Sequence, residues 1–238
     1  MLNELIKTEH GGLTVARKRY TVENTRRYKV FGSGARNEGI LRPRVGDLVP
    51  DELGASTTDG YEEVLLEWRE GAPSDPGGID RPQARSAGQV LARIHRRQGD
   101  WYGSIDGAHR FERQSDGYAP RWAHALRVLA GAHPRLAGDV ERWARPLLAE
   151  LDWEFARYGD PREDWAVTEM GRQYGDHNSF GRDEGAVAGL REGYLAEGGS
   201  AEALEPVEIY LAYYACVFGV IMPDPRRIAW LTERAGAG

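Results

Sequence analysis

The sequence predicts an α+β protein in two parts, with a small β-rich part over residues 1–68 and a larger helical part over residues 83–238. Three observations lead to this fold class. Runs with β-branched and alternating apolar residues concentrate in the first 68 residues. Residues 69–82 form a crossing segment, because the stretch GAPSDPGGIDRP contains three prolines and three glycines. From Gln83 onward, apolar residues recur at helical spacing.

The first part is predicted to contain a hairpin, one helix and a further strand. The alternating run LTVARKRYT follows the turn residues His10-Gly11-Gly12, which predicts a β-hairpin over residues 4–21. The pattern becomes helical over residues 24–45, and Pro43 limits the length of that helix. YEEVLLEW, residues 61–68, predicts the next strand.

The second part is predicted to be helical almost throughout. AGQVLARIHRR places Val90, Leu91 and Ile94 on one helical face. The long stretch from Trp122 to Trp153 predicts two amphipathic helices separated at His133-Pro134. Two further helices are expected over residues 183–197 and 206–220.

Composition excludes several classes of function. The chain has 238 residues, with 31 Lys+Arg against 37 Asp+Glu and a formal net charge of -6. A nucleic-acid-binding protein would need a basic surface to release counterions, so we expect no nucleic-acid partner. The longest apolar run, residues 209–222, ends before Pro223 and predicts a buried helix rather than a membrane span, so we expect no membrane partner.

Localisation and redox chemistry follow from two further features. The segment MLNELIKTEHGG has no apolar core and no small-residue cleavage site, which favours a cytoplasmic protein. The single cysteine, Cys216, excludes an internal disulfide and a cysteine-based metal cluster. Its apolar surroundings, IYLAYYACVFG, predict a buried structural thiol rather than a nucleophile.

Four segments then follow one another in a recognisable order. They are VARK at residues 15–18, VLLEWREG at 64–71, SAGQVLARIHRRQGDWYG at 86–103 and DWEFARYGDPREDWA at 152–166. Together they resemble the aminoglycoside phosphotransferase family, the small-molecule relatives of protein kinases. The resemblance implies a bilobal protein-kinase-like fold with a truncated N-terminal lobe, a hinge, and a larger helical lobe.

The resemblance assigns a nucleotide site to the first two segments. Lys18 corresponds to the strand lysine that holds the nucleotide phosphates, and Glu38 corresponds to the helix glutamate that pairs with it. Backbone groups around Glu67, Trp68 and Arg69 would bind adenine at the hinge. Alternatives remain open, since Lys18 could lie in a solvated strand, Lys29 is a competing lysine, and VLLEWREG could be a plain edge strand.

The third segment is implied to be structural. His95 ends the first large helix of the family's second lobe, where a histidine packs beneath the active site, so we assign it no catalytic role. GYAPRW, residues 117–122, is similar to a helix that walls the acceptor site. By the same resemblance, helices between residues 100 and 150 and after residue 183 would hold the acceptor.

The fourth segment is similar to the family's metal motif, the counterpart of Asp-Phe-Gly in protein kinases. Asp152 would ligate Mg²⁺, because a hard dication bridging two phosphates needs a carboxylate oxygen. Asp160 lies in the turn that follows, and Asp164 would support the site by capping a helix or orienting a neighbouring loop. A chance acidic helix cap is the alternative interpretation.

Active members of the family carry a catalytic loop, His-Gly-Asp-x-x-x-x-Asn, about twenty residues before the metal aspartate. None of the six histidines here is followed by x-Asp, and VERWARPLLAEL stands where the loop is expected. No catalytic residue is identified, and Asp176 in Gly175-Asp176-His177-Asn178 is the one candidate that the residue types leave. A glycine-rich loop over the phosphates is also expected to be missing or reduced ahead of Lys18.

These observations favour a degenerate, pseudokinase-like phosphotransferase that binds a nucleotide, a peptide or a protein partner and transfers little phosphate by itself. ATP and Mg²⁺ are the implied cofactors if the nucleotide site functions. The alternative is an active ATP-dependent phosphotransferase acting on a hydroxyl of a small molecule or peptide, with the catalytic loop missing from this sequence. A helical interaction protein is a third possibility, which the seven tryptophans would fit.

Overall fold

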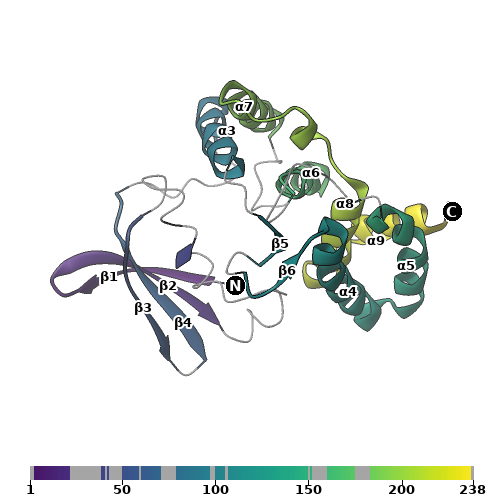
Figure 1. Cartoon of the computed structure of the whole chain (residues 1–238), viewed down its shortest axis with the longest axis horizontal. Coiled ribbons are helices and arrows are strands. Elements are labelled where there is room, and N and C mark those ends of the chain that lie inside the picture. Colours follow the sequence, from purple (N-terminus) through teal and green to yellow (C-terminus); the bar gives the residue numbers. More distant parts are fainter. Residues whose placement is uncertain are drawn as a thin grey trace. The chain divides into compact units, whose positions relative to one another are not determined.

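The structure is a computed structural model, and it describes residues 3–21, 39, 40, 42, 50–58, 60–70, 79–96, 100–104, 107–149, 151, 160–174 and 183–236. The chain divides into two compact units. The first comprises Met1–Pro73 with Ser104–Arg110, and the second comprises Ser74–Gly103 with Phe111–Gly238. The elements confirm the predicted α+β class, with an antiparallel sheet in the first unit and helices in the second (Figure 1).

The sheet of the first unit has four antiparallel strands in the order β1-β2-β4-β3. Their bounds are Asn3–His10 for β1, Leu13–Thr21 for β2, Glu52–Thr58 for β3 and Tyr61–Glu67 for β4. The hairpin predicted over residues 4–21 is confirmed as β1–β2. Its turn uses Gly11 and Gly12, which both have positive φ, a conformation that a side chain would disfavour.

Strand β3 was not predicted from the sequence. ELGASTT contains no alternating apolar face, and all but one of its residues are exposed. Its pairing with β4 holds it in place, with an irregular register between Glu52 and Gly54. The helix predicted over residues 24–45 lies almost entirely outside the described residues, of which Gly39, Ile40 and Arg42 are helical.

The second unit is built from helices, and those predicted between residues 83 and 220 are confirmed. The helices are α3 Arg81–His95, α4 Gln114–Ala132, α5 Pro134–Ala149, α6 Arg162–Tyr174, α7 Glu184–Ala196, the 3₁₀ turn η4 Glu202–Leu204, α8 Glu208–Ile221 and α9 Pro225–Gly236. Two strands of two residues each, β5 Tyr102–Gly103 and β6 Arg110–Phe111, precede α4. Helices α6 and α9 were not predicted.

Local sequence explains several helix boundaries. Asp80 caps α3, because its carboxylate accepts from the Gln83 backbone while the Gln83 side chain accepts from the Asp80 backbone. Asp183 caps α7 by accepting from the Ala186 N–H at 2.9 Å. The break between α4 and α5 falls at His133-Pro134, as predicted.

Two apolar clusters hold the helices together. The larger one joins α4, α5, α6, α8 and α9, and Ala212, Ala215 and Cys216 of α8 are completely buried in it. Helix α8 therefore runs through the core of this unit. The segment Glu202–Ile221 is long and apolar enough to cross a membrane, but 56% of its most apolar window is buried within the protein, as in a core helix. The burial raises the pKa of the Cys216 thiol to about 12, so the thiol stays protonated, which fits the predicted structural role.

The smaller cluster joins α3 and α7, which lie side by side (Figure 1), and also includes Trp165 of α6 and residues of η4. The backbones of α3 and α7 approach at glycines. A Cβ atom at Gly88, Gly189 or Gly193 would overlap a backbone carbonyl oxygen of the other helix. Because only glycine leaves room for this approach, these residues determine how closely the two helices pack.

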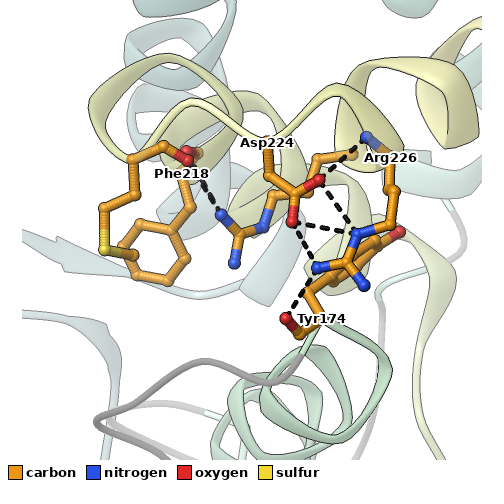
Figure 2. Close-up of polar contacts among 6 residues, drawn as sticks. Tyr174, Phe218, Asp224 and Arg226 are labelled. Atoms are coloured by element: carbon orange, nitrogen blue, oxygen red, sulfur yellow. Dashed lines mark hydrogen bonds and ion pairs between the residues drawn. The ribbon is translucent and has the colours of Figure 1, made fainter.

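Two consecutive arginines close the C-terminal ends of α6 and α8 (Figure 2). Arg226 donates from Nη2 to the carbonyl of Tyr174, the last residue of α6, at 2.8 Å. Arg227, which is 1% exposed, donates from Nη1 to the Met222 carbonyl at 3.0 Å, next to the end of α8. Both donations satisfy carbonyls that a helix end leaves unpaired. The Asp224 carboxylate accepts hydrogen bonds from the backbone N–H and the side-chain nitrogens of Arg226, and so holds Arg226 in place.

Candidate functional site

One face of the sheet in the first unit carries Lys18. The register places Lys18 between Leu5 of β1 and Val64 of β4, and neighbouring Ala16 is opposite Leu66. Alternation puts Ala16, Lys18 and Tyr20 on this face. Ala16, Tyr20, Val64 and Leu66 form its buried apolar floor, with Trp68 packed against them. The Lys18 ammonium lies 5.1 Å from the centroid of the Tyr20 ring.

The neighbouring arginines lie on the opposite face. Arg19 Nε donates to Glu63 Oε2 at 2.8 Å, and Arg17 Nε is 3.5 Å from Glu63 Oε1. The hydrogen bond from Glu63 raises the pKa of Arg19. Lys18 thus shares its face with the apolar residues Ala16, Val64 and Leu66 and with Glu62, which is opposite Tyr20, while Arg17 and Arg19 lie on the other face.

The end of β4 carries the three predicted hinge residues. Glu67 is the last residue of the strand, and its backbone N–H already donates to the Asp51 carbonyl at 2.8 Å. Arg69 Nε donates to the Glu67 carboxylate at 3.2 Å. Trp68 packs against the apolar floor, and its Nε1 donates to Glu70 at 2.9 Å. A base at the end of β4, which lies between β2 and β3 in the sheet, would therefore need backbone groups other than the Glu67 N–H.

In the second unit, Asp160 immediately precedes α6 and is almost completely buried. Its carboxylate accepts from the Arg162 backbone N–H at 2.9 Å and from Arg162 Nε at 2.7 Å. The Tyr210 hydroxyl of α8 donates to Asp160 Oδ2 at 2.9 Å. Burial and then the Asp160 carboxylate raise the pKa of Tyr210, so the hydroxyl remains a donor at any physiological pH. Asp160 therefore serves the first turn of α6 as its capping carboxylate.

Glu163, in the same turn, forms an ion pair with Arg121 of α4. Arg121 Nη1 donates to Glu163 Oε2 at 2.7 Å, its Nη2 bonds the other carboxylate oxygen, and the Tyr214 hydroxyl of α8 donates to Oε1 at 3.2 Å. Burial raises the pKa of Glu163. Burial opposes the charge on Arg121, but the Glu163 carboxylate raises the pKa of Arg121 overall. Tyr118 and Tyr213 flank the guanidinium at 5.3 and 5.2 Å from their ring centroids.

Asp164 bonds to His95 rather than to the backbone of a helix end. His95 Nε2 lies 3.0 Å from Asp164 Oδ2, and His95 Nδ1 lies 3.0 Å from the Tyr194 hydroxyl. A carboxylate can only accept, so His95 Nε2 carries the proton. Burial, followed by Asp164 and Asp160, raises the pKa of Tyr194 to about 12. His95 therefore links α3, α6 and α7, in agreement with the structural role given to it.

Two solved structures are similar to the chain over nearly all of its length. A candidate fructosamine-3-kinase from Haemophilus somnus 129PT has a TM-score of 0.63 and 14% identity, covering 99% of this chain and 87% of the other. A second, from Thermobifida fusca YX-ER1, has a TM-score of 0.58 and 15% identity, covering 98% and 92%. The chain has a kinase-like fold. No protein-family model and no curated protein sequence matches this kinase-like chain.

The structure describes part of the predicted site of this kinase-like protein. Lys18 and the hinge residues lie in the first unit, and Asp160 and Asp164 lie in the second. Glu38, Asp152 and Asp176 lie outside the described residues, as does the competing Lys29. Within the described ranges, no group of three or more His, Cys, Asp or Glu side chains could hold a metal ion.

Sequence reasoning missed the polar network around the first turn of α6. Arg121 lies within GYAPRW and Glu163 lies within the metal motif, yet 42 residues separate them. Tyr210 and Tyr214 lie in an apolar run that predicts a core helix and nothing more. The one available signal was their spacing of four residues, which places both hydroxyls on the same side of α8.

Proposed function

We propose that this kinase-like protein binds a nucleotide through the Lys18 face of its sheet and transfers little phosphate by itself. The observation that carries the proposal is that the sheet separates Lys18 from Arg17 and Arg19 and places its ammonium beside buried apolar residues. Arg17 and Arg19 are paired with Glu63 on one face, while Lys18 shares the other with Ala16, Val64 and Leu66. An ammonium beside an apolar floor can hold phosphate oxygens while a base covers the floor.

Low autonomous transfer is supported by what precedes Asp152. Helix α5 continues to Ala149, and Leu151 is 2% exposed in the helical core. Residues 134–149 therefore form a helix, at the position in the sequence where a catalytic loop would have to lie. The sequence has no His-x-Asp that could supply the base. Positioning and charge neutralisation alone provide part of the catalysis of phosphoryl transfer, so a slow residual activity is compatible with the proposal.

The remaining roles belong to the same proposal. Asp152 would ligate Mg²⁺ if ATP binds as a metal complex, with Asp160 and Asp164 supporting the segment that follows. A small-molecule or peptide acceptor, or a protein partner that completes the site, would bind in the cytoplasm.

The test is calorimetric titration with ATP and ADP, with and without Mg²⁺, on the wild type and two matched variants. Lys18→Met removes the proposed phosphate ligand and is expected to weaken ATP binding about tenfold to a hundredfold. Arg17→Met is the control, because its side chain faces the other side of the sheet, and we expect unchanged affinity. Equal losses in both variants, or no nucleotide binding by the wild type, would contradict the proposal.

A second candidate is an active phosphotransferase acting on a sugar hydroxyl. It is favoured by the two solved structures, since both are described as candidate fructosamine-3-kinases and both cover almost the whole chain. Incubation with MgATP and a fructosamine, followed by measurement of ADP release and of phosphorylated product by mass spectrometry, distinguishes the two. Turnover at a typical kinase rate of about 1–100 s⁻¹ would replace the first proposal with the second. The encoding DNA would show whether about 20 residues of a catalytic loop belong before Asp152.

A further inference from the structure

A second lysine lies on the same face of the sheet as Lys18. Lys7 of β1 is directly opposite Ala16, which in turn is opposite Leu66 of β4. The Lys7 ammonium lies 4.3 Å from the ring centroid of Trp68 and 3.5 Å from Glu70 Oε1. Glu70 also accepts from Trp68 Nε1 at 2.9 Å. At the end of β4, each of the three side chains of Lys7, Trp68 and Glu70 therefore contacts the other two.

These side chains occupy the part of the face best suited to a planar base. Trp68 packs against the cluster of Ala16, Tyr20, Val64 and Leu66, so its ring extends the apolar floor. A nucleobase could stack on that floor, but an ammonium already covers the ring at cation–π distance. The ring cannot hold both at once. A base that binds here must first displace the Lys7 ammonium.

The contact is weak enough to be displaced. The Lys7 side chain is 51% exposed and that of Glu70 is 83% exposed, so solvent and salt screen their ion pair. A cation–π contact and an ion pair at exposed positions each correspond to a factor of about two to five in an equilibrium constant. Together they would reduce the affinity for a base without preventing its binding.

We propose that Lys7, held over Trp68 by Glu70, occupies the nucleobase position of this face and so sets how tightly the base portion of a nucleotide binds. This inference rests on the proposed nucleotide function, because it assumes that the base lies at the end of β4. It also adds a residue that the motif pattern does not contain. The Lys18 ammonium lies over the Tyr20 ring, whereas the Lys7 ammonium lies over the Trp68 ring. The two lysines therefore have separate roles. Lys18 would contact phosphate, and Lys7 would compete with the base.

Adenosine is the probe that isolates the base, because it has no phosphate for either lysine to attract. Calorimetric titration with adenosine is expected to show about threefold to tenfold tighter binding to Lys7→Met than to the wild type. Glu70→Gln should shift the affinity in the same direction by a smaller factor, since the ammonium then loses its carboxylate. Raising the salt concentration should tighten adenosine binding to the wild type more than to Lys7→Met.

Two controls separate this inference from the proposed function. Arg142→Met removes an exposed ion pair with Asp139 in α5 and should leave adenosine affinity unchanged. Lys18→Met should weaken ATP binding and leave adenosine binding unchanged.

If Lys7→Met binds adenosine equally or more weakly than the wild type, while ATP binding still depends on Lys18, the role of Lys7 is wrong and the proposed function stands. If ATP and adenosine bind to no variant, both are wrong. Lys7 and Glu70 are exposed, so we expect their substitution to leave folding intact, and thermal unfolding of each variant checks this.

Discussion

Two helix contacts in the second unit use opposite means to hold their partners. The α3–α7 contact depends on missing side chains, because Gly88, Gly189 and Gly193 let the two backbones meet. The contact of α4 and α8 with the first turn of α6 depends on buried polar side chains, with Arg121 bonded to Glu163 and Tyr210 bonded to Asp160. Side-chain volume therefore sets how closely α3 and α7 approach. The direction of hydrogen bonds sets how α4 and α8 meet the first turn of α6.

The two contacts should respond differently to substitution. A glycine contact tolerates no added atom, because the obstacle is backbone that cannot rotate away. A polar contact tolerates changes of shape but not the loss of one partner, since the other is then left buried without a hydrogen bond. His95 connects the two contacts, because it belongs to α3 and bonds to both Asp164 of α6 and Tyr194 of α7.

The largest effect is expected at the glycine contact. Gly193→Val would drive a Cβ atom into the Arg85 carbonyl of α3, and we expect a loss of about 3–4 kcal/mol in the free energy of unfolding. The matched control is Gly138→Ala in α5, where an added Cβ meets nothing within 4 Å. It should stabilise the protein by about 0.5–1 kcal/mol through helix propensity. Urea unfolding followed by circular dichroism measures both, and similar stabilities would mean that the helices can separate without cost.

The next effect tests the polar contact through its ion pair. Glu163→Leu leaves the Arg121 guanidinium half-buried without its carboxylate, and the free energy of unfolding should fall by about 2–3 kcal/mol. Adding Arg121→Met should restore most of that loss, because the unpaired charge is then gone. A double-mutant cycle in urea measures the coupling. Additive losses in the double variant would show that the two side chains do not act as a pair.

A smaller effect is expected from the tyrosine hydroxyls. Tyr210→Phe removes the donor to Asp160 and the acceptor for Gln114, both of which are buried, and should cost about 1–2 kcal/mol. Tyr214→Phe is the comparison, since Glu163 keeps both bonds from Arg121 and the loss should be about 0.5–1 kcal/mol. Thermal unfolding ranks the two variants, and the reverse order would contradict the role given to Asp160.

The smallest effect concerns pH at the end of α6 (Figure 2). Hydrogen bonds from Arg226 lower the pKa of Asp224 below its ordinary value of 3.8. A lowered pKa in the folded state means that Asp224 contributes stability above pH 3.8, and that this is lost as the pH falls through the folded-state pKa. Asp224→Asn should therefore cost about 0.5–1 kcal/mol at pH 7 and less at pH 2. Asp139→Asn, at an exposed ion pair of α5, should change stability less at both pH values.

The sequence predicted elements best where a local signal marks them. Gly11-Gly12 predicted the β1–β2 turn, and His133-Pro134 predicted the boundary of α4 and α5, because backbone preferences at these residues act without any partner. Strand β3 was missed because ELGASTT has no apolar periodicity, and its pairing with β4 is what makes it a strand. Helix α6 was missed because its first turn lies inside a motif interpreted for its chemistry.

The candidate site was predictable to a lesser degree. The order of motifs pointed to a kinase-like fold, and the solved structures agree with that fold. The roles of Lys18, the hinge and Asp152 stay predictions. Nothing local distinguished Asp160 as the buried capping carboxylate from Asp164 as the partner of His95, since both are aspartates four residues apart in a polar segment.

By itself, the sequence determined the two-part α+β layout, the type of most elements and the lack of a His-x-Asp catalytic loop. These depend on residue types and on periods within one element. Only the tertiary structure decided that Lys18 and the arginines beside it face opposite sides of the sheet, that Lys7 covers Trp68, and that Arg121 meets Glu163. Such contacts join residues tens of positions apart, and their geometry depends on strand register and helix packing, which no local pattern encodes.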